Sequence, residues 1–269
     1  MQTIPDNIRV LPELVEHLQS VGVYTFTKEA ALGKLGTPSK SFDASARRLA
    51  AKGALASPRR GFYVVVPAEY RSAGAPPPSW FIHALMAFHE QPYYVGLLSA
   101  AELHGAAHHR PQEFQVVTDR SLRPVTLGRG RLAWFVKRNI TTTPTIAVKT
   151  HTGQMNVSTP EATAFDLLRY VDAAGQLDNV ATVLAELAEK INGTRLVSAA
   201  KAGVELSVVQ RTGYLLDLVG GKSLTNRLAS WLERQRPRRT RLRPDRSVAD
   251  GPIDARWHLL VNDTVEPDA

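Results

Sequence analysis

The sequence contains no cysteine among its 269 residues. Disulfide bonds, thiol catalysis and zinc or iron–sulfur sites held by cysteine are therefore excluded. No apolar run reaches the roughly 18 residues that a membrane-spanning helix needs. The first residues also do not show the charged and then apolar pattern of a secretory signal. We expect a cytoplasmic protein that does not act at a membrane.

Acidic residues are scarce in three segments that are rich in lysine and arginine. Residues 28–60, 120–138 and 234–246 each carry a net charge of +6, and the whole chain carries +8. Because these segments together carry +18, the remainder of the chain carries −10. Segregated positive charge is typical of proteins that bind polyanions, since neutralised phosphates release their counterions. A charged run is also typical of an ordinary solvated surface.

No complete catalytic signature is present. Residues 221–223 (GKS) resemble the end of a phosphate-binding loop, but Leu216 stands where that motif needs its first glycine. The nuclease pattern of a carboxylate two residues before a lysine does not occur. Glu161 and Asp166 are five residues apart, which suits a shared helix face poorly, and Glu161 is interpreted as a first-turn acid that the helix dipole favours. We expect no catalytic residue, no metal site and no cofactor.

The first 70 residues show helix signals followed by a hairpin signal. Apolar spacing, capping residues and glycine stops predict short helices at 12–22, 28–35 and 38–52. Two short strands at 54–56 and 62–66 follow, joined by the turn SPRRG. Three helices and then a β-hairpin are the element order of a winged helix-turn-helix.

The third predicted helix has one apolar face, which includes Phe42 and Ala46, and an opposite face of small and basic residues. That face and the hairpin turn supply the candidate DNA contacts, which are Lys40, Ser41, Ala44, Arg47, Arg48, Arg59 and Arg60. We expect Lys40 and Ser41 to lie nearest the bases and Ala44 to permit close approach, while the arginines hold phosphates. The alternative is that these cations only solvate a surface helix.

The rest of the chain predicts a larger second domain. Residues 71–79 (RSAGAPPPS) include three consecutive prolines and predict a semi-rigid linker. The second domain, 80–269, is expected to contain strands within 93–157, helices within 159–235 and a basic tail at 234–246. The predicted fold class is therefore α+β, a winged helix-turn-helix at 1–70 followed by a mixed domain. The second basic segment supplies possible secondary DNA contacts, which are Arg120, Arg123, Arg129, Arg131, Lys137 and Arg138.

Five segments, in order along the chain, carry a family resemblance. They are RRLAAKGALASPRRGFYVVVP (47–67), YYVGLLSAAELHGAAHHRPQEFQVVT (93–118), NVSTPEATAFDLLRY (156–170), VVQRTGYLLDLVG (208–220) and ARWHLLVNDTVEPD (255–268). Together they resemble the antitoxins of AbiE-type toxin–antitoxin systems, which act in abortive infection as a phage defence.

The resemblance implies an N-terminal winged helix-turn-helix and a larger C-terminal antitoxin domain. It implies a transcriptional repressor that binds inverted repeats in the double-stranded DNA of its own promoter. It also implies opposition to a nucleotidyltransferase-like toxin without a stable complex. Two alternatives stay open: an enzyme in the C-terminal domain that acts on nucleic acid or on the toxin's target, and a helical module that docks the toxin.

Overall fold

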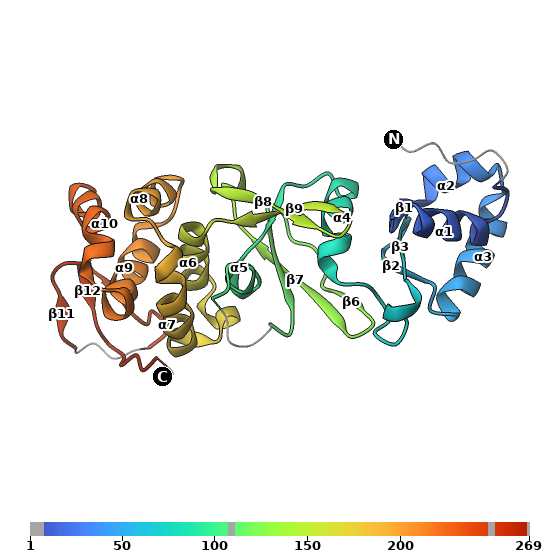
Figure 1. Ribbon diagram of the computed structural model, residues 1–269. Helices are drawn as coiled ribbons and strands as arrows, with labels where there is room; N and C mark the ends of the chain where they lie inside the picture. Colours follow the sequence, from blue (N-terminus) through green and yellow to red (C-terminus); the bar gives the residue numbers. More distant parts are fainter. Residues whose placement is uncertain (1–7, 107–110, 247–250, 268–269) are drawn as a thin grey trace.

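The computed structural model describes residues 8–106, 111–246 and 251–267. The molecule is elongated, with a unit of three helices and a hairpin at one end, a mixed sheet in the middle and a helical region at the other end (Figure 1). The fold class is α+β, as the sequence predicts. Within the described ranges, no helix combines the length and the apolar character that crossing a bilayer would require.

The N-terminal unit contains three helices and a three-stranded antiparallel sheet. The helices are α1 (Leu11–Ser20), α2 (Lys28–Leu35) and α3 (Ser39–Ala51), and the strands are β1 (Thr25–Thr27), β2 (Leu55–Arg59) and β3 (Phe62–Val65). The sheet order is β1-β3-β2. The caps of α2 agree with the sequence, since the Thr27 hydroxyl accepts a hydrogen bond from Ala30 N at 3.1 Å and Gly36 ends the helix in the left-handed conformation.

The hairpin differs from its prediction at the turn. Strand β2 continues through Ser57 and Pro58 to Arg59, with a register irregularity between Ala56 and Arg59. The turn between β2 and β3 is therefore shorter than the predicted turn SPRRG. Gly61 within it adopts a φ of 87°, a conformation that favours glycine. The charged tip is thus held on a paired strand and a short turn.

The central region is a six-stranded mixed sheet with two short helices. Its strand order is β6-β7-β5-β4-β9-β8. The strands are β4 (Tyr93–Val95), β5 (Phe114–Thr118), β6 (Val125–Leu127), β7 (Gly130–Val136), β8 (Thr145–Thr150) and β9 (Gly153–Ser158), and the helices are α4 (Ile82–Phe88) and α5 (Leu97–Leu103). All six strands lie within 93–157, where the sequence predicts strands, and β8 and β9 form an antiparallel hairpin.

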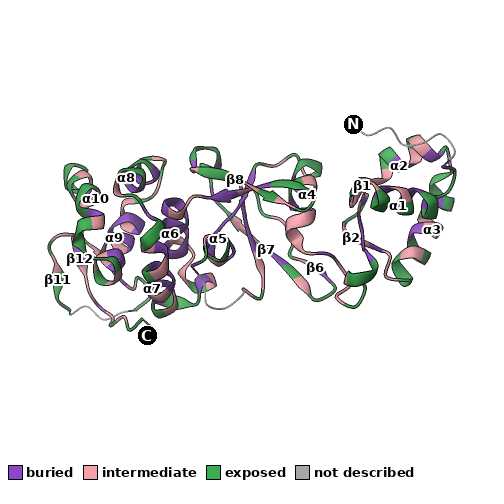
Figure 2. Ribbon diagram, in the orientation of Figure 1, coloured by how far each residue is buried: buried purple, intermediate pink, exposed green. Residues whose placement is uncertain are grey.

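The remainder of the chain is mainly helical. The helices are α6 (Pro160–Arg169), α7 (Gln176–Leu187), α8 (Gly193–Lys201), α9 (Leu206–Gly220) and α10 (Lys222–Arg234). A small sheet closes the chain, made of β10 (Thr240–Arg241), β11 (Ile253–Asp254) and β12 (Leu259–Leu260). Buried residues gather on α6 and α9 (Figure 2), and Trp257 packs into the same core. The predicted basic tail is part of this fold, since β10 pairs with β12 and Leu242 is buried.

The hairpin of the N-terminal unit packs against the central region. Phe62 and Val64 of β3 belong to the same buried cluster as Phe81 and Leu85. The ring of Phe62 also lies 5.5 Å from that of Phe88 at the end of α4, measured between centroids. The two regions therefore share apolar core, so the N-terminal unit does not bury its residues alone.

The predicted linker, 71–79, is packed rather than extended as a spacer. Arg129 N donates to Ala73 O at 2.9 Å, which fastens the segment to the turn between β6 and β7. A Cβ on Gly128 would lie 1.8 Å from Ala73 O, and one on Gly74 would lie 2.6 Å from the Gly128 Cα. Two facing glycines thus allow backbone contact that the prolines alone do not predict.

Candidate functional site

The exposed face of α3 and the tip of the hairpin form the candidate nucleic-acid interface. Its exposed residues are Lys40, Ser41, Arg47, Arg48, Arg59 and Arg60, and Ala44 is half-buried beside them. None of the five cations forms an ion pair with any residue that the structure describes. Their charges are therefore available to a ligand.

Lys28 connects the two parts of this interface. Its backbone N donates to Gly61 O at the hairpin tip, at 2.8 Å, and its Nζ lies 2.5 Å from Asp43 Oδ1 on α3. Asp43 is the one acid in α3, so this ion pair neutralises the charge that would otherwise repel a polyanion. The same contacts hold the tip and the helix in one arrangement.

The hairpin tip also meets a histidine at the end of α4. Burial, and secondly the positive charge of Arg59, lower the pKa of His89 below its ordinary value. Because the unfolded chain binds this proton more readily, the contribution of His89 to stability falls as the pH drops below the ordinary histidine pKa.

Replacing Arg59 with alanine is expected to raise the pKa of His89 partway toward its ordinary value, because the electrostatic cause is removed and burial remains. The measurement is an NMR titration of the imidazole in the two proteins. The Arg60→Ala variant is the matched control, and an equal shift there would contradict a specific effect of Arg59.

The basic residues of the second segment, 120–138, differ in their exposure and in their ion pairing. Lys137 is 5% exposed and is not a surface contact, which corrects its place among the secondary DNA candidates. Arg131 pairs with Glu113 at 2.8 Å, and Arg120 lies 3.7 Å from Asp119. The members that are exposed without an ion pair to the described residues are Arg123, Arg129 and Arg138.

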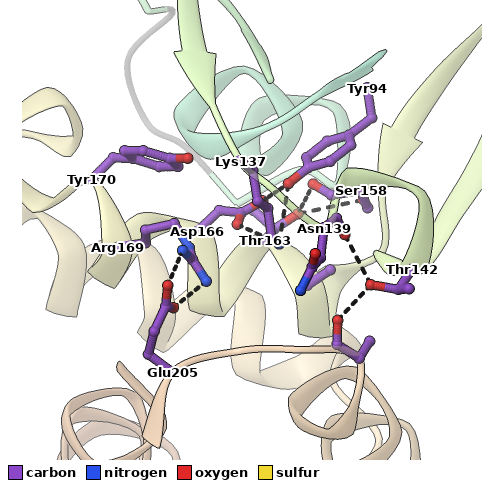
Figure 3. A network of polar contacts seen from close by, with 12 residues as sticks. Tyr94, Lys137, Asn139, Thr142, Ser158, Thr163, Asp166, Arg169, Tyr170 and Glu205 are labelled. Atoms are coloured by element: carbon purple, nitrogen blue, oxygen red, sulfur yellow. Dashed lines mark hydrogen bonds and ion pairs between the residues drawn. The ribbon is translucent and has the colours of Figure 1, made fainter. Parts of the chain in front are cut away.

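Lys137 belongs to a buried polar network between the sheet and α6 (Figure 3). Its Nζ lies 3.2 Å from Asp166 Oδ1 and 3.3 Å from the Tyr94 hydroxyl, and that hydroxyl donates to Asp166 Oδ2 at 2.7 Å. Burial, followed by the negative charge of Asp166, raises the pKa of Tyr94 far above its ordinary value. The three side chains satisfy one another, so the network is a structural link.

Further polar contacts continue this link toward the helical region. Arg169 of α6 forms an ion pair with Glu205 just before α9. The hydroxyl of Thr142 lies 2.6 Å from Ala202 O, after α8. Sequence reasoning missed these contacts, since their partners are 36 and 60 residues apart and no local pattern marks them.

The two carboxylates considered for catalysis are both engaged. Asp166 is fully buried in the network, and Glu161 is 1% exposed in the first turn of α6, the position that the sequence predicts. Glu161 Oε1 accepts hydrogen bonds from Asn192 N and Arg195 Nε, each at 2.9 Å. In the described part of the chain, no three acidic or histidine side chains converge where they could hold a metal ion.

This architecture defines a class of α+β protein in which a three-helix unit with a hairpin precedes a mixed sheet and a helical region. It is similar to the crystal structure of the RV2827C protein from Mycobacterium tuberculosis, with a TM-score of 0.66 and 17% sequence identity. The likeness covers 94% of this chain and 92% of the other. At this identity it establishes the fold alone.

The sequence match is more specific. Residues 94–218, from β4 to α9, match the family model of the AbiEi antitoxin C-terminal domain. Residues 94–218 are thus similar to an AbiEi antitoxin C-terminal domain, which confirms the predicted resemblance to the AbiE-type antitoxin family. This domain supports a role as the antitoxin of a toxin–antitoxin system. A search of curated proteins finds no match.

Proposed function

We propose that this antitoxin represses its own operon by binding promoter DNA through α3 and the hairpin tip. The supporting observation is the group of five exposed cations that have no ion-pair partner in the described chain. A binding surface needs such free charges, because cations already paired internally release fewer counterions on contact with phosphate.

The N-terminal end of α3 is the part of the helix best suited to enter a major groove. It begins at Ser39 without a side-chain cap, so its first backbone N–H groups are open to an anion. Lys40 and Ser41 follow directly and are exposed. We propose that they reach base edges, while Arg47 and Arg48 contact phosphates and the hairpin arginines contact the flanking backbone or minor groove.

The test is titration of the Arg59→Ala/Arg60→Ala variant onto the chain's own promoter at several salt concentrations. Each lost phosphate contact lowers the salt slope by about one, so the double variant is expected to bind more weakly and to lose about two units of slope. A matched control is Lys190→Ala/Lys222→Ala, which removes two exposed charges from the helical region. Unchanged affinity and slope in the arginine variant would exclude the hairpin from the site.

We propose that the operator contains inverted repeats and that two copies of the chain bind it, since palindromic sites mirror a two-fold arrangement. Footprinting on the upstream DNA measures this directly. The domain boundaries of the proposal are 1–70 for DNA binding and 80–269 for the antitoxin domain, in a cytoplasmic protein. Arg123, Arg129 and Arg138 are the secondary candidates that remain exposed.

We propose that the toxin is nucleotidyltransferase-like and that the antitoxin opposes it without a stable complex, by binding rather than catalysis. The family resemblance supports a nucleotidyltransferase-like toxin that is opposed without a stable complex. The internal pairing of Glu161 and Asp166 supports an antitoxin that does not act as an enzyme. Co-expression with the neighbouring gene product tests both. Stable co-purification would instead favour the docking of toxin by the helical region.

A further inference from the structure

A cavity of about 640 Å³ lies where the proline-rich segment meets the central sheet. Its lining includes residues 75–79 of that segment, residues 111–114 at the start of β5, and Ser99, Glu102 and Leu103 of α5. The packed glycines and the bond from Arg129 N to Ala73 O hold the proline wall in place. The cavity is therefore a fixed feature of the fold, and its volume falls within the range of small-molecule sites.

Part of the cavity lining is formed by apolar core residues. Phe81, Leu132 and Met155 line it and are 1%, 0% and 2% exposed, so they are rigidly packed parts of the central core. Leu103 also lines it but is 43% exposed, which is unusual for a large aliphatic side chain beside a cavity. An apolar body placed here would cover this leucine and remove it from water.

The polar groups of the lining leave one cation unpaired. Arg131 Nη1 lies 2.8 Å from Glu113 Oε1, so these charges cancel. Glu102 has an interaction of its own. Ser99 Oγ already accepts a hydrogen bond from Gln115 N at 2.9 Å. Arg129, by contrast, is exposed and pairs with no carboxylate in the described chain.

We propose that this cavity binds a small organic acid with an apolar body and a single negative charge. The apolar body would lie against Phe81 and Leu132, and the acid group would accept hydrogen bonds from the guanidinium of Arg129. A charged hydrogen bond at the edge and an apolar interior are the usual means by which such pockets fix orientation and affinity. The site is separate from the candidate DNA contacts on α3 and the hairpin, and it shares Arg129 with the secondary DNA candidates.

The test is a fluorescence titration of the full chain with anilinonaphthalene sulfonate, a probe with an aromatic body and one sulfonate. Saturable binding to one site per chain is expected, with displacement by decanoate. Arg129→Ala is expected to weaken binding about tenfold or more, because it removes the charged partner. Ala75→Trp places an indole in the cavity wall and is expected to abolish the signal.

The matched control is Arg138→Ala, which removes an exposed cation that does not line this cavity. Equal binding by wild type, Arg129→Ala and Ala75→Trp would overturn the proposal, as would an equal loss in Arg138→Ala. Because Arg129 is exposed, its variant is expected to fold normally, and thermal unfolding checks this. No DNA is present, so failure of the proposed DNA-binding function would leave the result unaffected.

Discussion

Replacing Asp166 with alanine is expected to lower the free energy of unfolding by about 3–5 kcal/mol. The change leaves the ammonium of Lys137 buried without its carboxylate and deprives the Tyr94 hydroxyl of its acceptor. An unpaired buried charge is among the most costly defects that a single substitution creates. Urea denaturation followed by circular dichroism measures the loss.

Two further variants test whether the loss of stability in Asp166→Ala comes from the unpaired buried charge. Lys137→Met/Asp166→Leu removes both charges and is expected to recover most of the lost stability, because an apolar pair of similar size replaces a buried ion pair at little cost. Asp245→Ala removes an exposed carboxylate from its pair with Arg243, which still has Asp263 within 3.8 Å, and is expected to have a much smaller effect. If Asp166→Ala matched Asp245→Ala, the network would not be a major source of stability.

Replacing Gly213 with alanine is expected to destabilise the helical region by about 3 kcal/mol. A Cβ at this position would lie 2.1 Å from Cζ3 of Trp257. The indole cannot readily move, since it is fully buried and its Nε1 donates to Asp217 Oδ2 at 2.8 Å. Either α9 must shift or the tryptophan must leave its place, and thermal unfolding measures the result.

Gly33→Ala is the control for the same chemical change. Gly33 lies inside α2, and a Cβ there would meet nothing within 4 Å. Because alanine is the better helix former, this variant is expected to be more stable by about 0.5–1 kcal/mol. A stabilising effect at both glycines would show that the close contact with Trp257 is not maintained in solution.

Local chemistry made much of the fold predictable. Thr27 and Gly36 mark the ends of α2, and Thr159 with Pro160 marks the start of α6, because capping depends on residues adjacent in sequence. The sequence predicts strands within 93–157 but does not locate β4 or α5, because residues 93–103 are nearly all apolar and show neither the strand nor the helix periodicity.

The candidate site was likewise predictable where the sequence signal is local, and not where it depends on residues far apart in the chain. The exposed cations of α3 were found from helical spacing, which repeats every few residues. Lys137 was misplaced, because its partner Asp166 is 29 residues away and only the folded chain brings them together. A charge in the sequence therefore does not reveal whether it faces solvent or a buried carboxylate.

The core that Phe62 and Val64 share with Phe81 and Leu85 removes the hinge that a two-domain chain usually has. A fragment ending at residue 70 would expose these side chains, so we expect it to aggregate rather than fold cleanly. In the intact chain we expect the hairpin and α4 to open together, so that hydrogen exchange at one depends on the other. We therefore expect the hairpin and the central region to move as one rigid unit.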